Sequence, residues 1–204
     1  MPGMATDPEL LDAWRAGDAS AGEALFKRYY GLVSRFFANK VSTDPADLIQ
    51  DTFMGCLRGR ERLRDDAAFR KYVFGVAYNL LREHYRARHA DKFDPQTSSC
   101  ADLLPGPGTM MAKGDEQGLL LAALRRIPLP LQVVLELFYW EDMTSATIAE
   151  ILDEPHGTIR TRLRRARELL GKAIAGLDAE PGVVHRTATD LDGWAAQVRA
   201  AAAG

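Results

Sequence analysis

The segment from Met143 to Ile174 restricts the possible folds more than any other part of the chain. Its apolar residues recur at helical spacing on both sides of Pro155, which cannot continue a helix. The pattern predicts a short helix over about 145–152, a tight turn at 153–157 and a longer helix over about 158–173. Two helices joined by such a turn form a helix-turn-helix, a motif that DNA-binding proteins use.

The longer of these helices divides into an apolar face and a basic face. Its buried stripe is expected at Ile159, Leu163, Ala166 and Leu170. The inward positions of the short helix would be Ile148, Ala149 and Leu152, with Thr144 as its cap. A recognition helix needs this division, because one face packs on its own domain while the other reaches base edges in the major groove. The residues expected to contact duplex DNA are Thr158, Arg160, Thr161, Arg162, Arg164 and Arg165. The alternative is an ordinary solvated arginine-rich face.

The near-neutral charge of the chain hides two basic segments. The formal net charge is −2, which does not match a nucleic-acid binder that is basic throughout. Residues 58–92 nevertheless contain ten bases against five acids, and residues 156–172 contain six bases against one acid. Residues 115–155 are acidic, with eight acids and two bases. A DNA-binding surface is therefore expected locally, in each half of the chain.

Residues 7–90 are predicted to form helices. Ser20 and Glu23 have the capping-box spacing at the start of the first long helix. The apolar face of that helix would carry Leu25, Tyr29, Leu32, Val33 and Phe36. A second helix is expected to start at Asp44-Pro45 and to include Leu57, and a third to run from Asp65 or Asp66 to about Arg88.

Two segments lack helical periodicity. Residues 91–114 contain three prolines, three glycines and several Ser and Thr residues, a composition typical of a flexible linker. Residues 178–204 could be a disordered appendage, a short packing helix with Trp194 and Val198, or a regulatory segment. No convincing strand pattern is present. The predicted fold class is therefore all-α, with two helical domains joined by a flexible linker.

The second and third helices carry contrasting surfaces. The acids of the second, Asp47 and Asp51, are either partners of the helix dipole or part of a docking face. The third combines aromatic residues with cations, and cations follow a phosphate chain while rings stack on unpaired bases. Of its aromatic residues, Phe69 is expected in the core and Tyr78 is a candidate for the core, while Tyr85, among Arg and His residues, is less core-like.

These segments together resemble the extracytoplasmic-function (ECF) group of bacterial sigma factors, from about Asp7 to Ala173. DPADLIQDTF is similar to the family's region 2 signature, which grips the polymerase clamp. FRKYVFGVAYNLLREHYRAR looks like the helix that recognises the −10 element, and the preceding loop, about 60–68, is where the family captures a flipped-out base. PHGTIRTRLRRARELL is close to the recognition helix of region 4, which binds the −35 element.

The resemblance implies roles for individual residues. Contacts to core polymerase would come from Asp47, Leu48, Gln50, Asp51 and Phe53. Contacts to the −10 element would come from Lys71, Tyr72, Asn79, Arg82, Tyr85, Arg86 and Arg88. The six duplex-binding residues named above would read the −35 element. The chain departs from the family pattern at Leu57, where an aromatic residue is usual, and at Tyr72, Thr147 and Asp153. Asp153 replaces the customary turn glycine, so a positive φ there would cost more.

The implied function is that of a sigma factor, which directs core RNA polymerase to specific promoters and assists promoter opening without being an enzyme. Its domains would be region 2 over 7–90, a linker over 91–114, region 4 over 115–177 and an extension over 178–204. Its partners would be core polymerase, duplex −35 DNA, melted −10 DNA and an anti-sigma factor. No cofactor and no metal is expected. Two free cysteines, no long apolar stretch and no signal peptide predict a cytoplasmic protein that does not enter a membrane.

Two alternatives remain open from the residues alone. One is a one-component helix-turn-helix regulator that binds DNA without polymerase. The other is a metal or thiol enzyme, but its candidate residues match no known ligand spacing; they are Cys56, His84, His89 and Cys100.

Overall fold

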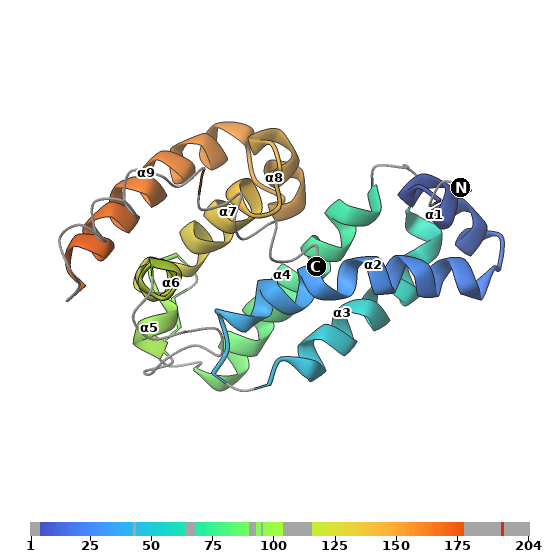
Figure 1. Ribbon diagram of the computed structural model, residues 1–204, viewed down its shortest axis with the longest axis horizontal. Helices are drawn as coiled ribbons and strands as arrows, with labels where there is room; N and C mark the ends of the chain where they lie inside the picture. The colour runs from blue at the N-terminus through green and yellow to red at the C-terminus, as the bar shows by residue number, and fades with distance from the viewer. Residues whose placement is uncertain are drawn as a thin grey trace.

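The computed structural model describes residues 5–42, 44–63, 68–89, 93–94, 96–103, 116–177 and 193. These residues are almost entirely helical, and the one extended contact among them is an isolated bridge between Ser99 and Pro128. Figure 1 shows helices α1–α4 as one group and α6–α9 as another, with the short helix α5 beside α6. The prediction of an all-α fold with two helical domains is confirmed.

The first group, here called the N-terminal domain, consists of four α-helices and one turn of 3₁₀ helix. They are α1 (Asp7–Arg15), α2 (Ala19–Ala38), α3 (Ala46–Gly59), the 3₁₀ turn Arg60–Arg62 and α4 (Ala68–Arg88). The expected apolar stripe of α2 is confirmed: Leu25, Tyr29, Val33 and Phe36 are buried, and Leu32 is half-buried. Residues 64–67, where the start of α4 was expected, lie outside the described residues.

The predicted capping box at Ser20 and Glu23 is wrong. Helix α2 starts earlier because Asp18 is its N-cap, and the Asp18 carboxylate accepts hydrogen bonds from the Ser20 and Ala21 amides at 2.8 and 3.4 Å. An acidic N-cap satisfies free amide groups as well as a serine does. A capping box does occur at the start of α1, between Thr6 and Glu9.

Helices α1 and α2 approach closely because α2 has a glycine at their contact. A Cβ atom on Gly22 would lie only 2.4 Å from Nε1 of Trp14. Trp14 in turn meets the rings of Phe26 and Phe69 edge-on, at centroid distances of 5.3 and 6.2 Å. This aromatic cluster joins α1, α2 and α4 and confirms that Phe69 belongs to the core.

The second group, here called the C-terminal domain, contains the predicted helix-turn-helix. Its helices are α6 (Glu116–Leu124), α7 (Leu129–Tyr139), α8 (Ser145–Leu152) and α9 (His156–Ala175). Helix α8 has the predicted bounds, and its N-cap Thr144 accepts a hydrogen bond from the Thr147 amide. The predicted inward residues of α8 and α9 are all buried. Asp153 ends α8 in the left-handed conformation, at φ 52°.

Residues 96–103, in the middle of the expected linker, are packed rather than free. They include α5 (Cys100–Leu103), and Ser98, Ser99 and Cys100 are buried. The Ala101 amide donates to the Arg125 carbonyl at 2.8 Å, and the Leu129 amide donates to the Ser98 carbonyl at 2.9 Å. Such hydrogen bonds fix backbone groups that a free linker would leave to water.

A buried ion pair connects the two domains. Lys40, just after α2, and Glu136, on α7, are both almost completely buried and form a direct salt bridge. The Lys40 ammonium group also donates to the Phe36 carbonyl at 2.6 Å, and Gln132 donates to Glu136 at 2.8 Å. Burial raises the pKa of Glu136, and the neighbouring Lys40 acts in the opposite direction. Each of these two buried charges is therefore neutralised by a residue of the other domain.

The expectation that Tyr85 is less core-like than Phe69 and Tyr78 is wrong. Tyr85 is completely buried, and its hydroxyl donates to the Lys40 carbonyl. It also contacts Sγ of Cys100 at 3.2 Å and stacks on Phe93 at a centroid distance of 5.4 Å. Neighbouring cations in the sequence suggested an exposed ring, but α5 and the end of α2 cover it.

The buried pair can be tested by removing its cation. Lys40→Met is expected to lower the free energy of unfolding by about 3–5 kcal/mol, because Glu136 then stays buried without a counter-charge. The double variant Lys40→Met/Glu136→Leu is expected to recover most of this loss. Urea denaturation followed by tryptophan fluorescence measures both effects.

The matched control is Lys27→Met, because Lys27 forms an ion pair with Glu23 on the exposed side of α2. Exposed pairs contribute roughly 0–1 kcal/mol, so this variant is expected to change little. An equally small loss in Lys40→Met would contradict the packed arrangement of the two domains.

Candidate nucleic-acid interface

The basic face of α9 points away from its own domain, as predicted. Arg160, Thr161, Arg164 and Arg165 are exposed, while Thr158 and Arg162 are half-buried. The buried stripe from Ile159 to Ile174 holds the opposite face against the other helices of the domain. The turn that aims α9 depends on Asp153, since residues other than Gly, Asn and Asp rarely adopt its left-handed conformation.

Two hollows flank the start of α9. One, of about 380 Å³, lies between Thr158, Thr161 and Arg165 on the helix and Gln96, Pro128, Pro130 and Leu131 on neighbouring segments. The other, of about 670 Å³, is lined on the opposite side by Ser145, Phe138, Arg160, Arg164 and Arg167. The first two turns of α9 therefore form a ridge that solvent reaches from both sides. This shape suits a helix that enters a groove of DNA.

Local contacts hold several basic side chains of α9. Arg162 forms an ion pair with Glu154 at 2.9 Å, and Arg164 lies 3.6 Å from Glu168. Nε of Arg167 donates to the Tyr139 hydroxyl at 2.8 Å, and its guanidinium lies over the rings of Phe138 and Tyr139. Arg160 and Arg165 form no ion pair with any described residue. These two are the predicted contacts that are most available to a ligand.

The residues predicted to bind the −10 strand fall into two groups along α4. Asn79, Arg86 and Arg88 are exposed, and Arg82 is half-buried over the Tyr78 ring at 5.6 Å. Lys71 and Tyr72, near the start of the helix, are half-buried, and Lys71 forms an ion pair with Glu150 of α8 at 2.6 Å. The candidate core residue Tyr78 is buried. The structure thus leaves the end of this surface open, while at its beginning Lys71 contacts α8 and Tyr72 lies beside Gly59 at the end of α3.

The acidic face of α3 is exposed. Asp47, Gln50 and Asp51 lie on the surface, and Leu48 and Phe53 are half-buried. Leu57, which the sequence placed on this helix, is 45% exposed. Of the expected base-capturing loop, only Arg60–Leu63 and Ala68 are described; residues 64–67 lie outside the described residues.

An apolar hollow beside this face was not found from the sequence. The large apolar residues that are exposed in the described part are Tyr30, Met54 and Leu57, all on α2 or α3. A hollow of about 420 Å³ lies next to Tyr30 and Leu57 and is lined also by Trp14, Phe26 and Phe53. Gathered apolar exposure is typical of a surface that binds another protein. The signal in the sequence was Tyr30, which falls outside the inward stripe of α2.

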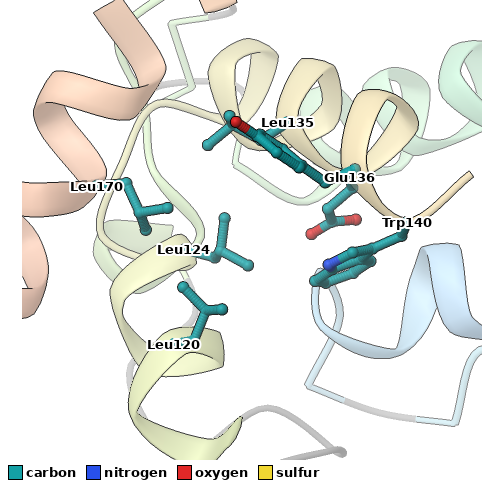
Figure 2. Close-up of a pocket in the computed structure, with 7 residues that line it drawn as sticks. Leu120, Leu124, Leu135, Glu136, Trp140 and Leu170 are labelled. Atoms are coloured by element: carbon teal, nitrogen blue, oxygen red, sulfur yellow. The ribbon is translucent and has the colours of Figure 1, made fainter. Parts of the chain in front are cut away.

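A small cavity lies inside the C-terminal domain. Figure 2 shows leucines of α6, α7 and α9 around it, with Glu136 and Trp140 at one side. Its volume of about 10 Å³ holds at most about one water molecule.

The two cysteines are buried, and burial raises the pKa of each thiol, that of Cys56 to about 12. A thiol that does not ionise is a poor nucleophile and a poor metal ligand. Among the described residues, no three His, Cys, Asp or Glu side chains are grouped as metal ligands. In the same part of the chain, no helix has both the length and the apolar composition to cross a bilayer.

Two family models match the chain. The model of sigma-70 region 2 matches residues 23–91, and the model of sigma-70 region 4 matches residues 117–170. The first covers most of α2 and all of α3 and α4, and the second covers α7, α8 and most of α6 and α9. The match to region 2 does not favour the alternative of a one-component regulator.

Two curated relatives align over most of the chain. The ECF RNA polymerase sigma-E factor of Haemophilus influenzae is 27% identical, with 84% of this chain and 97% of that protein covered. The RNA polymerase sigma-H factor of Pseudomonas aeruginosa is 26% identical, with 84% and 95% covered.

A solved structure has a similar fold. It contains CnrH in complex with the cytosolic domain of CnrY, and the match has a TM-score of 0.60 at 20% identity, covering 83% of this chain and 97% of that one. The two family matches together span more than half of the chain and coincide with its two helical domains. The protein therefore belongs to the sigma-70 family, as a sigma factor of the ECF type that directs RNA polymerase to specific promoters.

Proposed function

We propose that this sigma factor grips a promoter at two points while a third surface holds core RNA polymerase. Helix α9 would read the duplex −35 element, α4 would bind the separated −10 strand, and α3 would dock on the polymerase. The observation that carries this proposal is the exposed basic ridge of α9, set on a helix-turn-helix whose predicted inward residues are all buried in the domain.

On the duplex, some arginines of α9 would contact base edges and others would contact backbone phosphates. Arg160 and Arg165 are free to reach base edges, and one arginine can bond a guanine at two points. Arg164 extends from an exposed position and could hold a backbone phosphate, which gives affinity without sequence information. Arg162 would first have to leave Glu154, so its contact depends on an exchange of partners.

On the single strand, α4 would supply Asn79, Arg82, Arg86 and Arg88 from its accessible part. Lys71 would join only after it leaves Glu150 of α8, and Tyr72 only after it leaves its place beside Gly59 at the end of α3. Tyr85 would act by supporting the helix, since its buried ring has no surface to offer a base. Use of Lys71 by the strand therefore requires the contact between α4 and α8 to open.

The polymerase would dock on the exposed acids of α3, which are Asp47 and Asp51, and on the neighbouring Gln50. The apolar hollow beside Phe53 and Leu57 extends this face with the kind of surface that gives a protein interface its binding energy. Charge on the rim and apolar groups at the centre are the usual arrangement of such an interface.

The proposed domain limits follow the predicted ones: region 2 over 7–90, a linker over 91–114, region 4 over 115–177 and an extension over 178–204. Of that extension, Gly193 alone is described. The protein would work in the cytoplasm, with the polymerase carrying out all chemistry. Its structural neighbour CnrH was solved with the cytosolic domain of CnrY, and we propose that a protein partner likewise controls this sigma factor.

Transcription in vitro tests the proposed function. The purified chain is mixed with core polymerase and genomic DNA, and the start sites are mapped. Initiation from a defined set of sites that core polymerase alone does not use is expected. If no site depends on the chain, or if the chain binds the same sequences tightly without polymerase, the proposed function is wrong.

The reading role of α9 is tested by Arg165→Ala. This variant is expected to lose about 1–3 kcal/mol of promoter binding, a roughly five- to two-hundredfold loss, and to discriminate less at one −35 position. Transcription from promoters with systematically altered −35 elements measures both effects. The control is Lys172→Ala, which removes an exposed base from the last turn of the same helix and should leave the preference unchanged.

The docking role of α3 is tested by Asp51→Arg. Reversal of an interfacial charge is expected to weaken binding to core polymerase by at least about tenfold, since like charges across an interface cost several kcal/mol. The charge-matched control is Glu83→Arg, an exposed change on α4. Binding is measured with labelled sigma factor and core polymerase in the absence of DNA. Equal affinity of the two variants would mean that Asp51 only complements the helix dipole.

A further inference from the structure

Two arginines of the N-terminal domain hold one carboxylate of the C-terminal domain. Arg35, on α2, donates from NH2 to Oε1 of Glu141 at 2.7 Å. Arg70, on α4, donates from NH2 to Oε2 of the same carboxylate at 3.4 Å and also to the Glu141 carbonyl. Glu141 follows α7 and is buried. The pair Arg35 and Arg70, here called the two-arginine site, therefore surrounds an anion from the other domain.

The Glu141 carboxylate does not accept hydrogen bonds from all the donors of this site. Nε of Arg35 and Nε of Arg70 are both buried and have no hydrogen-bond partner. The side chain of Arg35 is only 10% exposed, so water does not easily satisfy it. A guanidinium binds an oxyanion most strongly when two of its nitrogens donate side by side. Here each arginine reaches the carboxylate through one nitrogen, which leaves donors free for an anion with more oxygens or a different position.

The two arginines also lack a counter-charge in their own domain. Among the described residues, the acid that pairs with each of them is Glu141. When the domains separate, two neighbouring guanidinium groups are left without an acid. Such a site attracts an anion from solution, and arginine is well suited to phosphate because of its planar set of donors.

We propose that the two-arginine site binds a backbone phosphate of the separated DNA strand, and that Glu141 occupies it when the domains are packed together. The inference rests on the proposed function, which places the single strand along α4. Arg70 directly precedes Lys71 and Tyr72, the first residues of that predicted strand-binding surface. A strand that reaches Lys71 would therefore bring a phosphate within reach of Arg70.

The neighbouring contact follows the same pattern. Lys71 is held by Glu150, which also belongs to the C-terminal domain. Two acids of one domain thus occupy positions on the other domain where anions of the strand would bind. Packing of the domains and binding of the strand therefore exclude each other at these positions.

The experiment compares variants of the full chain, without polymerase, for binding to a fluorescently labelled single-stranded oligothymidylate. Glu141→Arg repels the two arginines and exposes the site, so the affinity is expected to rise about five- to a hundredfold, the usual range for coupled equilibria. Adding Arg35→Ala and Arg70→Ala to this variant is expected to remove the gain. The slope of log affinity against log salt should also fall by about one, as for the loss of one phosphate contact.

Asp12→Arg is the matched control, because Asp12 is an ion-paired acid on α1, away from the domain interface, and the change in charge is the same. Glu141→Gln is a milder second variant and is expected to give a smaller rise, and circular dichroism checks the helical content of every protein. If Glu141→Arg binds no better than Asp12→Arg, or if the triple variant binds as well as Glu141→Arg, the site is only a tie between domains.

Failure of this inference is distinguishable from failure of the proposed function. A wild-type chain that directs polymerase to start sites, together with an unchanged oligonucleotide affinity in Glu141→Arg, removes the phosphate site alone. A wild-type chain that directs no initiation removes the proposed function, whatever the oligonucleotide measurements give.

Discussion

The packed arrangement of the two domains depends on charges that are buried in pairs. Lys40 and Glu136 lie almost entirely out of water, so each would be costly to leave alone. A buried pair adds little net stability compared with apolar groups of the same size, because both charges lose their hydration. Such a pair instead disfavours every other packing arrangement, because a buried charge without its partner is costly. The pair therefore favours one packing arrangement of the two domains but adds little to the free energy that holds them together.

That balance fits a protein that must change its arrangement to work. The covered groups are the beginning of α4, the two-arginine site and Tyr85, and all of them contact the C-terminal domain or the segment 96–103. The exposed groups are the α9 ridge and the α3 face. In the proposed function, polymerase binds first through α3. A higher affinity of polymerase for the form with separated domains would then raise the population of that form.

The sequence was sufficient for features that depend on one element. The bounds of α8, the buried stripe of α9 and the left-handed position of Asp153 all follow from local periodicity and turn chemistry. It was insufficient where a second element decides. Tyr85 is buried by α5, and Arg35 and Arg70 share Glu141 of the other domain. Helix α2 begins at Ala19 because Asp18, and not Ser20, is its N-cap. Periodicity identifies the inward face of a helix, but it does not identify what covers the outward face.

The Cys100 thiol is buried between Tyr85 and Gln132, so its accessibility depends on how the two domains are arranged. This thiol sits where the segment 96–103 meets both domains, so solvent reaches it only in molecules whose domains have moved apart. Cys56 lies inside the N-terminal domain and is shielded by that domain itself. A small alkylating reagent would therefore modify Cys100 when the domains separate and Cys56 only when the N-terminal domain unfolds. The rate of alkylation of Cys100 would report domain separation, and the rate at Cys56 would serve as its internal control.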